Sequence, residues 1–351
     1  MLEGNSPQRR RIQKASDYIK RGDWADLWQE VMQFLAWKGI VRSSRQMRAC
    51  ASFTPRQSLI LWGSAQPSLE HHSTLWTNKS FDNFLSFETQ VFGESFPIPA
   101  YDPYLIRYGE YRFVLEMLPF QSGETVLDLG CERNIFILYL AHLGVRALGV
   151  DLNPQVWEGL HENKTIVERM TGRKLDVTFR AEDATRLGLE SESVDKVIAI
   201  SSIEHMFSEQ GHGDQLAMAG VARVLKPGGL AVITLPMSNG GPFHEAPKGD
   251  EQFGGPYRLY TPEALKERIL SQPELDQVQL CHLAHTTPDS RYAHLQFFRF
   301  WMESLTPEER RKWAWANPIL AAIFNPIVSQ EEGERRPETV NTVLICLRKK
   351  S

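Results

Sequence analysis

Two aspartates in the middle of the chain are spaced as in a site that binds a nucleotide. Asp128 lies in an apolar run that ends at Gly130, and Asp151 closes the next apolar run about 20 residues after that glycine. A carboxylate in the second position can accept hydrogen bonds from both hydroxyls of a ribose. The glycine lets a ligand come close to backbone N–H groups at a helix N-terminus. This pair of residues therefore indicates nucleotide binding.

These side chains must be positioned by a strand, a turn, a helix and a second strand. Residues 126–129 form a short apolar run, and residues 135–143 carry apolar side chains at helical spacing. Residues 145–150 form the second apolar run and lead directly to Asp151. A buried strand that breaks at a glycine into a helix is the first half of a βαβ nucleotide-binding unit. The sequence thus predicts an α/β fold.

Five segments, in order along the chain, resemble the motifs of the class I S-adenosylmethionine-dependent methyltransferases, nearest their type 11 group. They are VLDLGCERN at 126–134, GVDLNP at 149–154, AEDATRL at 181–187, VDKVIAISSIEHM at 194–206 and VLKPGGLAVITLP at 224–236. The resemblance covers residues 101–350 or so. It implies a seven-stranded Rossmann-like sheet of order 3-2-1-4-5-7-6, with the last strand antiparallel to the others.

The resemblance also implies S-adenosyl-L-methionine as the cofactor. It places the ribose on Asp151 and the adenine amine near Asp183, whose alternative role is that of a solvated loop residue. The cofactor-binding residues that it implies are Arg107, Asp128, Gly130, Cys131, Asp151, Leu152, Asp183, Ala184 and Ser201. Arg107 could form a two-pronged contact with a carboxylate, or it could pair within its own helix with Glu110 or Tyr111.

The chain departs from the family in the turn after the first strand. The family usually reads G-x-G-x-G, whereas this chain has Glu132 and Asn134 at the second and third glycines. Asn134 can cap the helix that follows. The side chain of Glu132 falls where the methionine part of the cofactor should pass. Either it turns away from a working site, or the chain is a noncatalytic interaction module that has lost its cofactor.

Two histidines are candidates for a general base in methyl transfer. His205 follows the apolar strand 194–200 and borders the cleft, and imidazole titrates near neutral pH. Its alternative is a structural role, packed under the nucleotide. His244 lies in the long glycine-rich loop 236–260, which has the character of a lid or binding loop.

We therefore expect an O-methyltransferase acting on a small molecule or a glycan. An NAD-dependent dehydrogenase shares the βαβ logic, but the segments at 181–187 and 224–236 match methyltransferases better. The histidines lack metal-ligand spacing, so no metal site is expected.

The chain has 351 residues, more than one average domain. Residues 1–100 are expected to be a mainly helical region that could cap the cleft, with a helix at 16–38. Residues 101–351 are expected to form the methyltransferase domain, with a helical insertion at about 286–338. The insertion could cover the substrate cleft, contact a membrane surface through 295–328, or form a dimer contact. The sequence leaves these three open, and with them the oligomeric state.

Composition limits the binding partners and the cellular compartment that we expect for the protein. A net charge of −4 does not favour nucleic-acid binding. The four cysteines, Cys50, Cys131, Cys281 and Cys346, show no paired spacing and suggest a reducing compartment. The N-terminus leads into no apolar signal region, and no apolar run reaches the roughly 18 residues of a membrane span. The expected location is the cytoplasm.

Overall fold

The computed structural model describes residues 79–92, 106–132, 134–209, 211–249, 255–284 and 327–351. The expected helix at 16–38 and Cys50 lie outside the described residues. So do residues 295–326 of the segment that could contact a membrane surface. Of the N-terminal region, the structure describes one helix, α5 (Lys79–Phe92).

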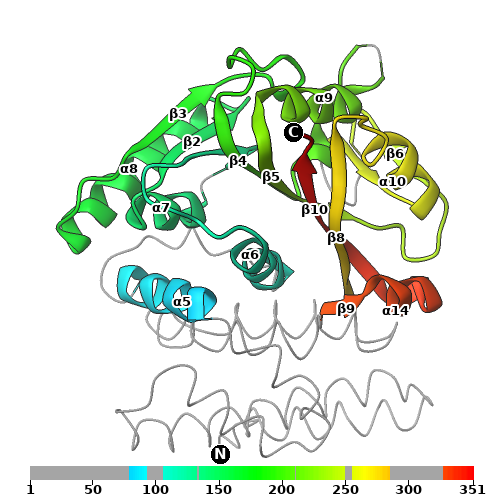
Figure 1. Cartoon of the computed structure of the whole chain (residues 1–351), viewed down its shortest axis with the longest axis horizontal. Coiled ribbons are helices and arrows are strands. Elements are labelled where there is room, and N and C mark those ends of the chain that lie inside the picture. The colour runs from blue at the N-terminus through cyan, green and yellow to red at the C-terminus, as the bar shows by residue number, and fades with distance from the viewer. Residues whose placement is uncertain (1–78, 93–105, 133, 210, 250–254, 285–326) are drawn as a thin grey trace, which may run out of the picture.

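A mixed sheet of eight strands forms the centre of the described chain, in the order β3-β2-β1-β4-β5-β10-β8-β9 (Figure 1). Strands β1 to β5 run parallel to one another, and β10 is antiparallel to both β5 and β8. The strands are β1 (Thr125–Leu129), β2 (Arg146–Asp151), β3 (Val177–Ala181), β4 (Val194–Ile200), β5 (Leu225–Pro236), β8 (Leu275–Ala284), β9 (Ile327–Ser329) and β10 (Val340–Lys349).

The expected strand order is confirmed, with the antiparallel strand β10 inserted between β5 and β8. The expected count of seven was one too low. The short strand β9 lies within the expected insertion at about 286–338 and pairs with residues 281–283 at the outer edge of β8. Three residues at the end of a long insertion carry too weak a pattern to be recognised as a strand.

Helices cover both faces of this sheet (Figure 1). The sheet divides the hydrophobic core into two layers. One layer holds side chains from α5, α6 (Ile106–Met117), α7 (Ile135–His142) and α8 (Gln155–Thr171). The other holds side chains from α9 (Gly213–Val224) and α10 (Pro262–Arg268). Successive strand residues alternate between the layers, as Val126 and Leu127 do, which is the period of a strand buried on both faces.

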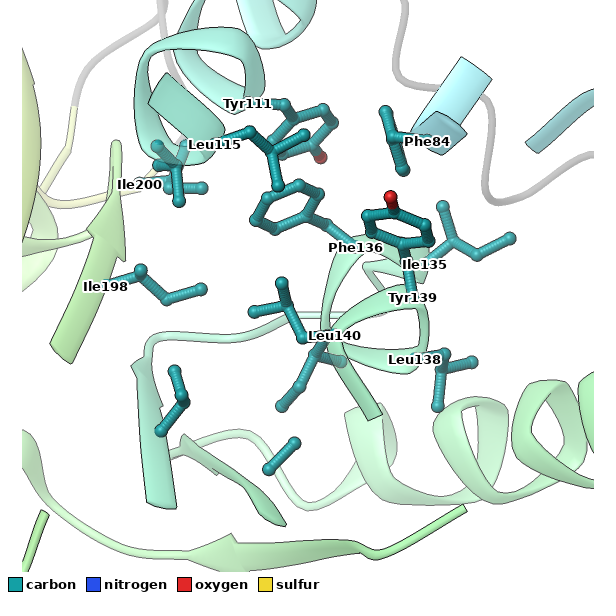
Figure 2. Close-up of a cluster of buried hydrophobic side chains, with 14 of the residues drawn as sticks. Phe84, Tyr111, Leu115, Ile135, Phe136, Leu138, Tyr139, Leu140, Ile198 and Ile200 are labelled. Atoms are coloured by element: carbon teal, nitrogen blue, oxygen red, sulfur yellow. The ribbon is translucent and has the colours of Figure 1, made fainter. Parts of the chain in front are cut away.

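An aromatic cluster joins α5 and α6 to the start of α7 (Figure 2). Phe136 stacks on Tyr111 with ring centroids 4.6 Å apart, and Phe84 packs edge-on against both rings. Tyr139 completes the cluster and donates a hydrogen bond from its hydroxyl to the Ser80 carbonyl. The cluster therefore holds the helix that follows the glycine turn.

The helix ends follow the sequence in two cases and depart from it in one. Asn134 caps α7 by accepting from the Phe136 N–H, and Thr261 caps α10 by accepting from the Ala264 N–H. In helix α8 Pro154, and not the short polar residue Asn153 before it, occupies the cap position. The Asn153 side chain still accepts a hydrogen bond from the Gln155 N–H.

The long loop after β5 contains a two-stranded hairpin of β6 (His244–Ala246) and β7 (Tyr257–Leu259). Short one-turn helices follow two of the strands, η4 (Ala184–Arg186) after β3 and η5 (Ile203–His205) after β4. A last helix, α14 (Gln330–Arg335), and the turn η7 (Pro337–Thr339) precede β10. Within the described ranges, no helix combines the length and the apolar character needed to cross a membrane.

Replacing Phe136 by alanine should strongly destabilise the protein. The ring is fully buried and stacked, so its loss leaves a cavity that costs about 3–5 kcal/mol. Leu216→Ala is the matched control, because that side chain is exposed on α9 and its loss should cost about 1 kcal/mol or less. Urea unfolding of both variants measures the difference, and equal losses would contradict the assigned core.

Candidate functional site

The glycine turn and the end of β2 are joined at the carboxyl edge of the sheet. The Asp151 carboxylate accepts from the Glu132 N–H at 3.1 Å through one oxygen and from the Asn153 N–H at 2.9 Å through the other. Gly130 has a φ of +75°, and a Cβ there would lie 2.5 Å from the Cβ of Ser202. The turn therefore needs glycine at its first position, as the motif predicts.

Glu132 adopts a backbone conformation that explains why related chains have glycine at this place. Its φ is +43°, in the left-handed region, where a Cβ is unfavourable. The side chain is exposed and forms no ion pair with any described residue. The neighbouring Cys131 thiol is buried and lies close to Gly149, and burial raises its pKa well above the ordinary range. A reactive thiolate is therefore excluded at Cys131.

Asp128 is a buried acid at the carboxyl end of β1. Its Oδ2 atom has no hydrogen-bond partner among the described residues. Burial, with a smaller contribution from Asp151, raises its pKa to about 8, and Arg107 opposes this shift. Asp128 therefore has an acceptor atom to offer to a ligand, and it becomes negatively charged when a bound cation lowers its pKa.

The Glu110 carboxylate on α6 links three elements at the same edge. Ser201 and Thr234 each donate a hydroxyl hydrogen bond of 2.6 Å to its Oε1 atom. Arg107 donates from Nη1 to Oε2 at 2.7 Å, while Glu110 itself is fully buried. Ser201 has a φ of +43°, and its N–H is held by Thr234, so the network fixes the chain where it leaves β4.

Two residues expected to bind the cofactor, Arg107 and Ser201, thus donate hydrogen bonds to Glu110. The Arg107–Glu110 pair is the intrahelical alternative that the sequence left open, and the Ser201 hydroxyl also points to Glu110. Arg107 remains close enough to Asp128 and Glu204 to influence the pKa of each. The network therefore places the Arg107 guanidinium near the carboxyl groups of Asp128 and Glu204.

The remaining predicted cofactor residues lie after β2 and β3. Leu152 follows Asp151 and is 70% exposed, an unusual position for a large apolar side chain. Asp183 caps η4, since its Oδ1 accepts from both the N–H and the hydroxyl of Thr185. Ala184 is buried beneath it. Strands β2 and β3 are neighbours and parallel, so their carboxyl ends share one edge.

His205 lies after β4, and the side chain is 52% exposed. Its Nδ1 atom lies 2.6 Å from the Pro256 carbonyl oxygen, directly before β7. Its Nε2 atom lies 3.8 Å from Oε1 of Glu204, whose side chain is 4% exposed. Burial raises the pKa of Glu204 to about 7. His244, the other candidate base, lies in β6 and contacts the Tyr257 hydroxyl through Nε2 at 3.0 Å.

A buried ionic cluster beneath the hairpin was not predicted from the sequence. Arg258 in β7 is fully buried, contacts Glu245 Oε1 from Nε at 2.6 Å, and donates from Nη1 to the Met206 carbonyl at 2.8 Å. The fully buried Asp214 accepts from Arg268 and Tyr260. Charged residues in a glycine-rich loop ordinarily indicate a solvated surface, so the sequence carried no signal for this cluster.

The expected cofactor fits the residues at this edge. Asp151 still has acceptor capacity for ribose hydroxyls, because an ionised carboxylate accepts about four hydrogen bonds and two are used. Leu152 offers an apolar surface for a base, and the unpartnered Asp128 oxygen suits a cationic group. Among the described residues, no group of three or more His, Cys, Asp or Glu could hold a metal ion.

Replacing Glu132 by glycine should stabilise the protein by about 0.5–1 kcal/mol, because it relieves a left-handed conformation at an exposed position. Glu158→Gly is the matched control, since the same change within helix α8 should destabilise by a similar amount. Urea unfolding gives both values. A loss of stability at position 132 would show that the turn is not strained there.

Comparison with known proteins agrees with this arrangement. Residues 127–233 match the family model described as a methyltransferase domain. This range runs from β1 to β5 and contains the glycine turn, Asp151 and His205.

Two curated relatives and a solved structure show the same likeness. The chain is 30% identical over 145 residues to the S-adenosyl-L-methionine-dependent Diels-Alderase iccD of Talaromyces variabilis, covering 40% of this chain and 47% of the relative. It is 27% identical over 112 residues to the cypemycin N-terminal methyltransferase of a Streptomyces species, covering 32% and 42%. The chain thus spans about half the length of these relatives. The structure of the [4+2]-cyclase SpnF is 17% identical, with a TM-score of 0.49, covering 78% of this chain and 94% of that one.

The family match, the motif order and the strand order agree with one another. The cofactor of this family is S-adenosyl-L-methionine, and the acids at the sheet edge fit it. Residues 127–233 thus match a methyltransferase domain, and the strand order around them is that expected of the class I S-adenosyl-L-methionine-dependent methyltransferases.

Proposed function

We propose that the protein transfers a methyl group from S-adenosyl-L-methionine to a hydroxyl group of a small molecule or a glycan. The observation that carries this proposal is the position of a half-exposed imidazole, that of His205, at the edge that also holds the turn and Asp151. A hydroxyl is a weak nucleophile and benefits from a base whose pKa lies near neutrality. An acceptor at this edge would meet both groups.

The protein residues divide the work in this proposal. The cofactor supplies an activated methyl group, so the protein must chiefly align the acceptor and remove its proton. Asp151 holds the ribose, and Asp128 faces the cationic part of the cofactor. His205 takes the hydroxyl proton at Nε2, because Nδ1 faces the carbonyl of Pro256. The half-exposed ring then returns this proton to solvent.

A second candidate is a cyclase that binds the same cofactor without consuming it. The relative iccD, which is 30% identical over the matched residues, is named a Diels-Alderase dependent on S-adenosyl-L-methionine. This candidate uses the same cofactor edge but predicts no transferred methyl group. A noncatalytic module, by contrast, would not bind the cofactor at all.

Calorimetric titration of the full chain with S-adenosyl-L-methionine and with NAD tests the cofactor assignment. We expect saturable binding of the first and none of the second. Binding of NAD alone would favour a dehydrogenase, and binding of neither would favour the noncatalytic module. Glu132→Gly should bind at least as tightly as the parent, whereas binding that appears only in this variant would mean that Glu132 blocks the site.

Replacing Asp151 by alanine should weaken cofactor binding by about 1.5–3 kcal/mol, because a hydroxyl pair loses its acceptor and the Glu132 and Asn153 N–H groups lose theirs. The matched control is Asp176→Ala, at an exposed position directly before β3, which should leave the affinity unchanged. Calorimetry measures both variants. An unchanged affinity for Asp151→Ala would place the ribose elsewhere.

Cofactor binding near neutral pH should release protons. Asp128, with its pKa raised to about 8, is mostly protonated at pH 7, and a bound cation lowers that pKa. The affinity for the cofactor should therefore increase as the pH rises toward 8 and decrease as the pH is lowered. Titrations in two buffers of different ionisation enthalpy should give different heats, and Asp128→Asn should remove most of the difference. Equal heats for the parent protein would contradict the assignment.

A further inference from the structure

The β6–β7 hairpin is anchored at His205 and at the two residues that follow it. Arg258 of β7 reaches the Met206 carbonyl, directly after His205, and its guanidinium carbon lies 3.7 Å from the centre of the Phe207 ring. Two residues before Arg258, the Pro256 carbonyl contacts the His205 ring. A fully buried guanidinium that keeps its ion pair with Glu245 holds such a contact in one geometry. The hairpin thus places a fixed carbonyl against one ring nitrogen.

This contact determines which nitrogen of His205 carries the proton. A carbonyl oxygen only accepts hydrogen bonds, so a 2.6 Å contact with Nδ1 requires a hydrogen on Nδ1 in both the neutral and the charged ring. The lone pair of the neutral ring is then on Nε2. The side chain is 52% exposed, so the ring is open to solvent.

Glu204 faces the same nitrogen from inside the protein. Its Oε1 atom lies 3.8 Å from Nε2 of His205, and its buried Oε2 atom has no hydrogen-bond partner within the described ranges. Other charged or titratable groups that act on Glu204 are Arg107 and Glu110 on α6, and Glu204 in turn acts on Tyr260 next to β7. A buried carboxyl with a purely structural role is normally paired with donors, as Glu110 is with three.

We propose that Glu204 is a positioning residue that stabilises the protonated ring of His205, while the Pro256 carbonyl fixes the tautomer. The imidazole of His205 thus lies between the Pro256 carbonyl, directly before β7, and the carboxylate of Glu204, the preceding residue in η5. Its catalytic use rests on the proposed function. When the acceptor O–H bond breaks, an N–H bond forms at Nε2, and the positive charge of the imidazolium faces the Glu204 carboxylate. The proton leaves from the exposed ring to solvent.

Nuclear magnetic resonance of the full chain with isotope-labelled histidine tests this directly and needs no acceptor. The ring nitrogens of the ten histidines are followed from about pH 5 to pH 9, and His205 is identified by its loss in His205→Asn. We expect the neutral ring to carry its proton on Nδ1.

Glu204→Gln should keep the Nδ1 tautomer and lower the proton affinity of His205 at least about threefold, because an opposite charge within 4–6 Å or so is removed. Glu204→Met, which has neither charge nor hydrogen-bonding oxygen, should do the same if the glutamine variant fails to fold. Glu116→Gln on α6 is the control, since that carboxylate pairs with Arg112, and it should leave His205 unchanged.

Two results would overturn the proposal. One is a neutral His205 with its proton on Nε2, which the parent protein alone can reveal. The other is a proton affinity that changes less than twofold when Glu204 loses its charge. Neither result depends on methyl transfer. A coupled pair in a protein that transfers no methyl group would therefore refute the proposed function and leave the pair standing.

Discussion

The arrangement of the candidate site depends on one buried carboxylate, that of Glu110. It accepts hydrogen bonds from α6, from the residue after β4 and from β5, and so ties a helix to the ends of two strands. Removing it would take an acceptor away from all three donors, of which the Thr234 hydroxyl is fully buried, and losing the partner of a buried polar group is costly. The same carboxylate holds Arg107 near Asp128 and Glu204. The electrostatic character of the site follows from this arrangement.

Two buried acids, Asp128 and Glu204, lie near Arg107. Each has a buried oxygen without a hydrogen-bond partner in the part of the chain that the structure describes, and burial raises the pKa of both. A cationic ligand beside Asp128 and an imidazolium beside Glu204 would supply the missing positive charges. The two acids thus suit two different tasks, one in binding the cofactor and the other in holding a proton.

The sequence predicted the sheet well, because buried parallel strands are continuous apolar runs that stop at glycine or polar residues. Strand β4 has the predicted bounds, and the Asn134 and Thr261 caps lie where short polar side chains precede helices. Asp151 was recognisable as well, since its place is set by local spacing. The edge strand β9 was missed because three residues show no period.

The polar networks could not be predicted, because their members are far apart in the chain. Glu110 meets Ser201 across 91 positions and Thr234 across 124, and each residue alone is unremarkable. The left-handed backbone at Glu132 could not be predicted either, because a glutamate in the sequence does not indicate a positive φ. His205 was recognised as a candidate base, but the carbonyl and the carboxylate that flank its ring required the structure.

The most direct test of the central claim is to follow the methyl group itself. The full chain would be incubated with S-adenosyl-L-methionine labelled in its methyl group and with a small-molecule extract rich in hydroxyl compounds. We predict that mass spectrometry finds the label on oxygen of a product, with an equal amount of S-adenosylhomocysteine, and that at a low cofactor concentration both decrease together in Asp151→Ala. Label on nitrogen would correct the acceptor atom. A bound but unconsumed cofactor, with no labelled product from any hydroxyl compound, would contradict the account.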